Sequence, residues 1–309
     1  MPNALLYKRL KCRINSLAYD PKRSILTGGL SDGTIRAWDL SAGNSDILAR
    51  YPGEILCIAF DPRHPMVAAG SSDGAIHLFD LVKNNSKLLK GHTGKVTSIA
   101  YDPVNEELAS GAFDGTIRIW NLKNGNNRVL ERDTVRGEGL SYTPSMDCVV
   151  YSREGKYLAC CSRGGEIHIW NRDNKEHQVL KNYWAESIFL DSSGSRLFVG
   201  TLDCRIYIID LKNGKEEPLG VFKKHGQPPI ITPDAKRERI AIIESDGVYI
   251  WNIDDGGTDI FNCNTSGIIT VAFAPKNEQI AIGYQDGTIR IGDIVSNTEV
   301  NSFMVSASD

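Results

Sequence analysis

The sequence predicts an all-β protein built from seven copies of one four-stranded unit, and three observations support this. A short motif that ends in an aromatic or apolar residue followed by an acid or amide recurs seven times. The recurrences are evenly spaced along the 309-residue chain, at intervals of 41, 41, 50, 39, 42 and 41 residues. Each interval holds short apolar alternations separated by turn residues, and no useful length of chain shows helical periodicity.

The recurring motif closes each unit. Its copies read SDGTIRAWDL, SDGAIHLFDL, FDGTIRIWNL, GGEIHIWNRD, DCRIYIIDL, SDGVYIWNI and QDGTIRIGDI, and they end near residues 39, 80, 121, 171, 210, 252 and 293. Length alone would suggest about two domains. The units extend from one end of the chain to the other, however, and leave no room for a second domain. We therefore expect a single domain over residues 1–309.

The third unit shows how each copy divides into four strands. Residues 88–90 form an apolar run before a GHTG turn, and residues 95–103 alternate until a proline stops them. Residues 106–112 form the next run, FDGT turns the chain, and residues 116–122 alternate again. Asp-Gly between alternating runs is typical of a tight hairpin, because glycine accepts positive φ without steric cost.

The repeat length, the Asp-Gly turn and the Trp-Asp or Trp-Asn pair resemble the WD-repeat (WD40) family over essentially the whole chain. The resemblance implies a seven-bladed β-propeller of four-stranded antiparallel blades that serves as a non-catalytic scaffold or sensor in protein assembly. It also implies a structural tetrad of a histidine, a strand serine or threonine, the turn aspartate and the strand tryptophan. The third unit alone matches it fully, with His92, Ser110, Asp114 and Trp120.

The tetrad decays in the other six units. Gly164 replaces the turn aspartate in the fourth unit. The serine position is occupied by residues without a hydroxyl group, namely Gly28, Ala69, Cys160, Val199, Ile242 and Ile282. We expect these blades to rely on apolar packing in place of a buried hydrogen-bond network.

Composition excludes several classes of function. Lys and Arg number 35 and Asp and Glu number 38, and a net charge of −3 gives no electrostatic case for a dedicated nucleic-acid binder. No apolar run approaches the roughly 18 residues of a membrane-spanning helix, and the N-terminus lacks the features of a secretory signal. The seven cysteines are odd in number and lie mostly in apolar runs, which is typical of a reduced, cytoplasmic protein.

Motifs that would carry chemistry are absent or explained by the repeat. Residues 70–74 match the G-x-S-x-G pattern of a nucleophile elbow. That elbow must join a strand to a helix, whereas here the pattern falls on a predicted hairpin, so we do not expect Ser72 to be a nucleophile. No phosphate-binding loop or zinc-ligand spacing occurs. We expect no enzyme activity, no cofactor and no metal site.

Three functions remain open at this point. The first is the binding of a protein or peptide by a monomeric propeller, alone or within a larger signalling protein. The second is the binding of nucleic acid or a phosphoinositide through the basic clusters at 223–225 and 236–239. The third is an enzyme with its site in the mouth of the central channel. The resemblance favours the first.

Four side chains are candidates for contact with a partner. In this family the usual peptide site is the face formed by the Asp-Gly hairpins and the loops that precede the innermost strands. Most residues there are small or polar, but Arg13, Phe113, Arg163 and Trp184 are not, and aromatic and arginine side chains dominate binding hot spots. The long fourth unit also places its extra residues in a loop at 134–145 on this face. Packing between blades is the alternative role for the two aromatics.

Closure of the ring is the last expectation. An open sheet edge invites aggregation, and in this family the outer strand of the last blade usually comes from the opposite end of the chain. Residues 5–7 match the apolar outer strands of the other units, whereas residues 301–303 match poorly. We expect residues 4–10 to form the outer strand of the seventh blade, with residues 298–309 as a tail or an extra edge strand.

Overall fold

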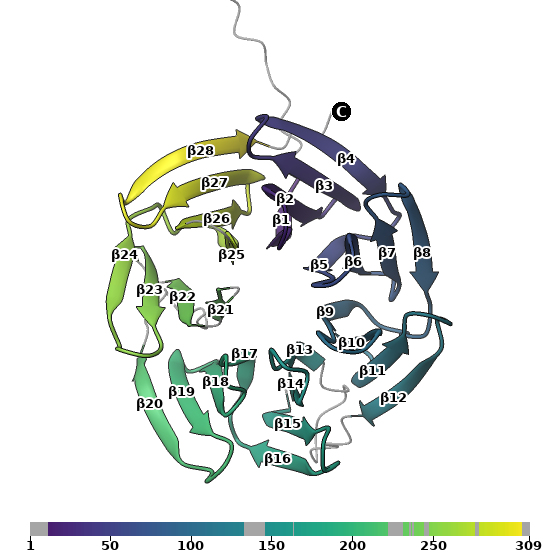
Figure 1. Cartoon of the computed structure of the whole chain (residues 1–309), viewed down its shortest axis with the longest axis vertical. Helices are drawn as coiled ribbons and strands as arrows, with labels where there is room; N and C mark the ends of the chain where they lie inside the picture. The colour runs from purple at the N-terminus through teal and green to yellow at the C-terminus, as the bar shows by residue number, and fades with distance from the viewer. Residues whose placement is uncertain are drawn as a thin grey trace, which may run out of the picture.

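The computed structural model of the chain is a ring of seven blades, which confirms the predicted fold class (Figure 1). It describes residues 12–132, 146–162, 164–221, 231–234, 236, 238–243, 247–275 and 278–304, and within these ranges every regular element is a strand. Each blade is a four-stranded antiparallel sheet whose strands pair in chain order. The first strand of each blade lies nearest the centre of the ring and the fourth lies at the rim (Figure 1).

The strand bounds follow the repeat. Blades 1 and 2 comprise β1 Ile14–Tyr19, β2 Ile25–Leu30, β3 Thr34–Asp39, β4 Asn44–Arg50, β5 Ile55–Phe60, β6 Met66–Ser71, β7 Ile76–Asp80 and β8 Asn85–Leu89. Blades 3 and 4 comprise β9 Val96–Tyr101, β10 Glu107–Ala112, β11 Thr116–Asn121, β12 Asn127–Arg132, β13 Met146–Tyr151, β14 Tyr157–Ser162, β15 Glu166–Asn171 and β16 His177–Lys181. Blades 5, 6 and 7 comprise β17 Ala185–Leu190, β18 Arg196–Thr201, β19 Arg205–Asp210, β20 Glu216–Val221, β21 Ile231–Pro233, β22 Arg239–Ile243, β23 Val248–Asn252, β24 Thr258–Phe261, β25 Ile268–Phe273, β26 Gln279–Tyr284, β27 Thr288–Asp293 and β28 Thr298–Met304.

The Asp-Gly hairpins join the second and third strands of the blades and lie at one face of the disc, which we call the hairpin face. In blade 3 the turn is closed by Gly115, whose φ is 72° and whose N–H donates to the Ala112 carbonyl at 3.1 Å. Asp114 accepts the backbone N–H of Thr116 at 3.0 Å. The aspartate thus satisfies the backbone of the turn, and the glycine supplies the left-handed conformation that the turn requires.

The opposite face, which we call the turn face, is organised by buried carboxylates at the end of the inner strands. Asp20 accepts the N–H groups of Lys22 and Arg23, at 2.8 and 3.1 Å. Asp61 and Asp102 make the same pair of bonds in blades 2 and 3. These side chains are almost completely buried, so the hydrogen bonds offset the cost of removing a charge from water.

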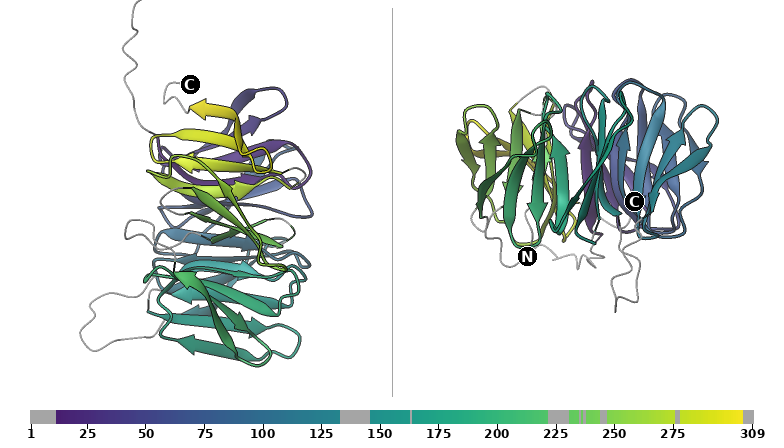
Figure 2. Two further views of the ribbon diagram at one scale, coloured as in Figure 1. Left: turned by 90° about the vertical axis from the view of Figure 1, so that its left-hand side faces the viewer. Right: turned by 90° about the horizontal axis from the view of Figure 1, so that it is seen from below.

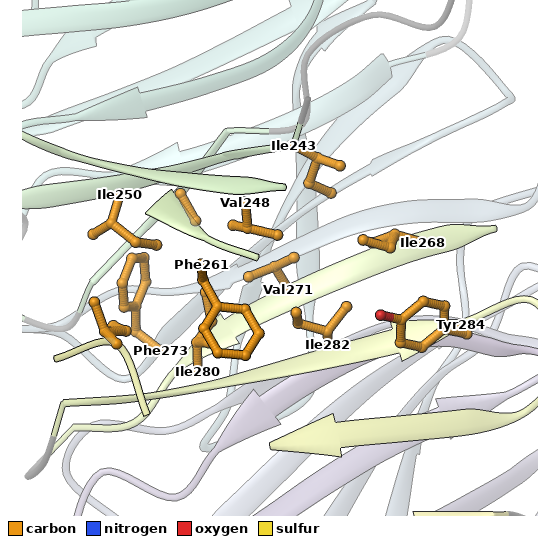
Figure 3. Packing of buried hydrophobic residues seen from close by; sticks show 12 residues of the cluster. Ile243, Val248, Ile250, Phe261, Ile268, Val271, Phe273, Ile280, Ile282 and Tyr284 are labelled. Atoms are coloured by element: carbon orange, nitrogen blue, oxygen red, sulfur yellow. The ribbon is translucent and has the colours of Figure 1, made fainter. Parts of the chain in front are cut away.

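Apolar layers between neighbouring blades form the core (Figure 3). Between blades 6 and 7, Phe261 at the end of β24 packs against residues of β25 and β26 such as Val271 and Ile282. Phe261 also explains why blade 7 has Gly292 where four of the other blades have tryptophan. A Cβ atom added at Gly292 would lie 2.0 Å from the Phe261 ring, so the phenylalanine occupies the space that a larger side chain would need.

The ring closes without strand exchange, and our expectation for its closure was wrong. β28 pairs with β27 as the outer strand of blade 7, so residues 298–304 are neither a tail nor an extra strand. Local turn chemistry favours this hairpin: Asn297 adopts a left-handed φ of 52°, and Asp293 accepts the Ser296 N–H at 2.8 Å. The proposed strand at 4–10 lies outside the described residues, and the position that it would fill belongs to β28.

The seam between blades 7 and 1 is held by side chains. Leu17, Leu26 and Trp38 of blade 1 pack with Ile289 and Ile291 of blade 7, and the half-buried Phe303 of β28 covers this layer. The backbone N–H of Leu17 also donates to Thr270 Oγ1 at 3.3 Å. Seen from the side, blades 1 and 7 continue the disc without a break in the stacking (Figure 2).

Candidate functional site

One hydrogen bond recurs around the hairpin face and fixes its residues in pairs. The residue before the inner strand presents its carbonyl to the N–H of the residue that begins the hairpin turn. The pairs are Arg13 with Ser31, Glu54 with Ser72, Lys95 with Phe113, Trp184 with Leu202, and Gly267 with Gln285, at 2.7 to 3.0 Å. In each of these blades the loop before the inner strand and the hairpin turn are therefore held next to each other by a backbone hydrogen bond.

Arg13 lies at the junction of blades 1 and 2 and is committed to an ion pair. Its guanidinium contacts Glu54 of blade 2 at 3.2 Å and donates to Asn15 at 2.8 Å. Both charged side chains are about two-fifths exposed. They border a hollow of about 560 Å³ that also reaches Gln285 and Asp286 of blade 7. This hollow is polar and bridges the seam of the ring.

Phe113 stands at the start of the blade 3 hairpin and is 44% exposed. Its Cβ lies 3.2 Å from the position that a Cβ atom on Gly94 would take, so the phenylalanine covers the loop before β9. Despite this contact within blade 3, Phe113 remains nearly half exposed to solvent.

Trp184 is the more exposed of the two aromatic candidates. It is 52% exposed and has a positive φ of 44°, which a bulky residue adopts only under strain. Its ring lies over the blade 4 hairpin, because a Cβ atom on Gly165 would meet ring carbons at 3.5 Å. The tryptophan thus bridges blades 4 and 5 on the hairpin face.

A hollow of about 420 Å³ opens beside Trp184. Leu202, which is 44% exposed, forms part of its wall together with Tyr183 and Tyr207. The two tyrosine rings meet edge to face at a centroid distance of 6.0 Å. Aromatic and aliphatic surface of this kind, held by backbone hydrogen bonds, is typical of a pocket that receives an apolar side chain.

Charged groups around this hollow are largely paired. The Tyr183 hydroxyl donates to Glu216, and burial together with that carboxylate raises the pKa of Tyr183. Lys181 contacts Glu166 at 3.2 Å, and Asp203 contacts Arg205 at 3.3 Å. The hollow therefore combines aromatic and aliphatic surface with a polar rim whose charged groups are paired.

Sequence reasoning passed over Leu202, Tyr183 and Tyr207. Leu202 occupies the same hairpin position as Phe113, and its size alone could have singled it out. Tyr183 and Tyr207 lie in a loop and a strand that carry no motif, so only the fold brings them to Trp184. Arg163 and the 134–145 loop lie outside the described residues.

The tetrad of blade 3 is connected by hydrogen bonds. The His92 imidazole contacts Asp114 at 2.9 Å and Ser110 at 2.7 Å, and the Trp120 indole N–H donates to Ser110 at 2.8 Å. Thr116 adds a bond to Asp114 at 2.6 Å. His92 and Trp120 are buried, so these bonds satisfy polar atoms inside the blade.

The remaining sequence candidates have structural contacts. Ser72 accepts the Glu54 N–H at 3.0 Å within the hairpin loop. Of the basic cluster at 236–239, Arg239 contacts Asp234 at 3.3 Å and also pairs with Glu278, while the cluster at 223–225 lies outside the described residues. In the described part of the chain, no three His, Cys, Asp or Glu side chains are grouped to hold a metal ion. The same part contains no helix with the length and apolarity needed to cross a membrane.

Comparison with known proteins agrees with the repeat architecture. The WD domain, G-beta repeat family matches residues 6–39, 45–80, 83–121, 142–171 and 258–293, which together cover more than half of the chain. The chain is also similar to the "Periodic tryptophan protein 2 homolog" of Dictyostelium discoideum, with 29% identity over 175 residues. That match covers 53% of this chain and 19% of the relative, so it spans about a fifth of that protein's length. With seven four-stranded blades and five matched repeats, this chain belongs to the WD40 repeat family of β-propellers.

Proposed function

We propose that this propeller is a non-catalytic protein-interaction module that binds a peptide or loop of a partner protein on its hairpin face. The observation that carries the proposal is the exposed apolar surface at blades 4 and 5. Trp184 and Leu202 are roughly half exposed, are joined by a backbone hydrogen bond, and border a hollow of about 420 Å³. Membership of the WD40 family supports the general role, and the hollow supports the place.

The proposed binding mode inserts an apolar side chain of the partner next to Trp184. A strained, exposed tryptophan on a rigid ring loses little conformational entropy on binding, which is one reason that tryptophan dominates hot spots. Phe113 on blade 3 and Arg13 on blade 1 would contact the same partner further around the face. Arg13 is already paired with Glu54, so its contribution is expected to be smaller than that of the aromatics.

Affinity capture from native lysate with quantitative mass spectrometry tests this proposal. The Trp184→Ala/Leu202→Ala variant should lose proteins that the wild type retains, because each hot-spot truncation costs about 2 kcal/mol or more. Val295→Ala is the matched control, since Val295 is 79% exposed but lies in the β27–β28 turn at the opposite face.

The outcome is read together with thermal stability. Both variants should melt close to the wild type, because the substituted side chains are exposed. Unimpaired capture by the double variant at wild-type stability would overturn the proposal. Phe113→Ala then reports whether the contact extends to blade 3.

We also propose that the propeller acts as a monomer in the cytoplasm. All seven cysteines are free thiols in the structure, which suits a reducing compartment. Light scattering on the purified chain and fractionation of the native cells would check the two parts of this statement separately.

A further inference from the structure

Blades 3 and 4 are separated by a groove of about 360 Å³ at the end of the strands away from the hairpins. Its wall includes Glu107, the first residue of β10, and Lys175 in the turn between β15 and β16. Both positions belong to the turn face, so this groove is distinct from the two hollows of the hairpin face. Its lining residues include Leu130 of β12 and Trp170 of β15, and these two strands are found in neighbouring blades in Figure 1.

The floor of the groove is apolar. Leu130 of β12 and Leu158 of β14 line it, and Trp170 of β15 lies between them as part of the layer that joins blades 3 and 4. Trp170 is only half buried, whereas Trp38 and Trp120 at the matching positions are 2% and 0% exposed. Blade 4 thus leaves part of the Trp170 indole exposed, although the His177 ring stacks on it at a centroid distance of 4.7 Å.

One polar group of the wall lacks a partner. Trp120 donates its indole N–H to Ser110, whereas the matching residue in blade 4 is Cys160, so the half-buried Trp170 has no serine hydroxyl at that position. Tyr151 is 2% exposed, and its hydroxyl has no hydrogen-bond partner among the described residues. Buried polar groups without partners are uncommon and call for a ligand or a water molecule.

The rim of the groove is positively charged. Arg128 and Lys175 are exposed, and neither has a carboxylate within 4 Å among the residues that the structure describes. Arg172, by contrast, is occupied by Asp102 and Glu107. The groove therefore offers hydrogen-bond donors and positive charge, while its one carboxylate is already paired.

The backbone conformation of Lys175 is a separate sign that this cation is unusual. It stands at the left-handed position of the turn between the third and fourth strands, with φ of 61°. The same position is glycine in four blades and asparagine in two: Gly43, Gly125, Gly214, Gly256, Asn84 and Asn297. Glycine and asparagine adopt this conformation at a lower cost than lysine, so the turn carries the Lys175 ammonium group together with backbone strain.

We propose that the groove between blades 3 and 4 binds an acidic, aliphatic peptide segment of a partner protein. A carboxylate of the peptide lies between Arg128 and Lys175, and an aliphatic side chain rests on Leu130 and Trp170. Donors and positive charge select a carboxylate, and the apolar floor selects an aliphatic neighbour. This second site is independent of the hairpin face, so one ring can hold two partners or two segments of one partner.

Fluorescence anisotropy with a labelled set of short peptides tests the proposal directly. The probes alternate Asp or Glu with Leu at different spacings, and the matched probes carry Asn or Gln in place of the acids. The acidic probes should bind at least about tenfold more tightly than the amide probes. Their affinity should also fall as salt is added, because the rim charges are exposed.

Lys175→Gly is the decisive variant because it removes the cation without harming the fold. Glycine relieves the strained φ, so the melting temperature should stay the same or rise. The acidic probe should nevertheless bind roughly three- to fivefold more weakly, and Arg128→Gln should act in the same direction. Lys212→Gln is the matched control, since Lys212 is an exposed lysine in the corresponding turn of blade 5.

Three results would overturn the proposal. The first is equal binding of the acidic and amide probes, or no binding by any acidic probe. The second is unchanged affinity in both Lys175→Gly and Arg128→Gln. The third is displacement of the acidic probe by millimolar inorganic phosphate, which would assign the groove to a phosphorylated ligand.

Discussion

In blade 3, Ser110 in the middle of β10 hydrogen-bonds both His92 and Trp120. In blade 5, the matching residues of β18 and β19 are Val199 and Ile209, which are 0% and 1% exposed and pack with Leu197 in an apolar layer. The pairing of strands is nevertheless the same, with Ser110 opposite Ile99 and Val199 opposite Ile188. One blade geometry is thus stabilised by a polar network in one place and by aliphatic packing in another.

The comparison shows that the tetrad is not what specifies a blade. The family match omits residues 172–257, yet β17 to β23 lie in this range and belong to two complete four-stranded blades. What blades 3 and 5 share is the apolar alternation of the strands and the backbone bond that links Lys95 to Phe113 and Trp184 to Leu202. These features determine the pleat and the turn. The buried positions inside the blade can hold different side chains, provided that every buried polar atom has a hydrogen-bond partner.

Exchanging Ser110 and Val199 between the two blades should produce the largest change in the free energy of unfolding. Ser110→Val leaves the Trp120 N–H and the His92 Nε2 without a partner in a buried site, and each such loss costs about 1–3 kcal/mol. Val199→Ser places a lone hydroxyl among aliphatic side chains at a cost of about 2 kcal/mol. Urea unfolding of both variants should therefore show blade 3 as the more sensitive of the two.

A matched pair of variants separates polar from steric effects. Ser110→Ala removes the same hydrogen bonds without added volume and should still destabilise, whereas Val199→Ala should cost only the lost methyl groups. A neutral Ser110→Ala variant would show that the network of blade 3 contributes nothing beyond packing.

Asp114→Asn should cause the next largest loss in the free energy of unfolding, and the size of this loss should depend on pH. Burial alone would raise the pKa of Asp114, but hydrogen bonds from His92, Thr116 and the Thr93 backbone outweigh it and hold the pKa well below the ordinary value of 3.8. The folded state therefore favours the ionised carboxylate. That contribution is fully present above about pH 5 and is lost as the pH falls below 3.8 towards the folded-state pKa.

Chemical unfolding between pH 7 and pH 2 measures this dependence. The free energy of unfolding of the wild type should exceed that of Asp114→Asn by about 2 kcal/mol at pH 7, and the two values should converge at low pH. Asp203→Asn in blade 5 is the control, because its carboxylate is 57% exposed, accepts a hydrogen bond from Thr201 and pairs with the exposed Arg205. A constant difference between wild type and Asp114→Asn across the range would contradict the assignment.

Much of the fold could be predicted from residues that act locally. The Asp-Gly turns, the alternating strands and the repeat interval fix seven blades, because each rests on contacts within about 40 residues of chain. Closure could not be predicted in this way. In blade 7 the bulge in the pairing of β27 with β28 falls between Ile291 and Gly292, near the end of β27. In blade 1 the bulge in the pairing of β3 with β4 falls between Ile35 and Arg36, near the start of β3. The shift turns Phe303 towards the seam, and no tripeptide comparison detects it.

The candidate sites show the same limit. Trp184 and Phe113 stand out in the sequence because large residues are rare at their repeat positions. Lys175 and Arg128 belong to different blades, and only the ring brings them to one groove. A comparison of the seven turns does single out Lys175, since it replaces glycine or asparagine, but that comparison requires the register that the structure provides.

The smallest expected effect tests the one position at which the blade 5 hairpin departs from the others. Cys204 has a φ of 63° where blade 3 has Gly115 with a φ of 72°, and both N–H groups close the same turn, at 3.0 and 3.1 Å. Glycine adopts this conformation freely, whereas a Cβ atom is strained there. Cys204→Gly should therefore stabilise blade 5 by about 0.5–1 kcal/mol, and Gly115→Cys should destabilise blade 3 by at least as much. Thermal unfolding of the two variants gives both values. If the two substitutions changed stability in the same direction, the turns would not be equivalent, and the shared geometry of blades 3 and 5 would have to arise from their strands alone.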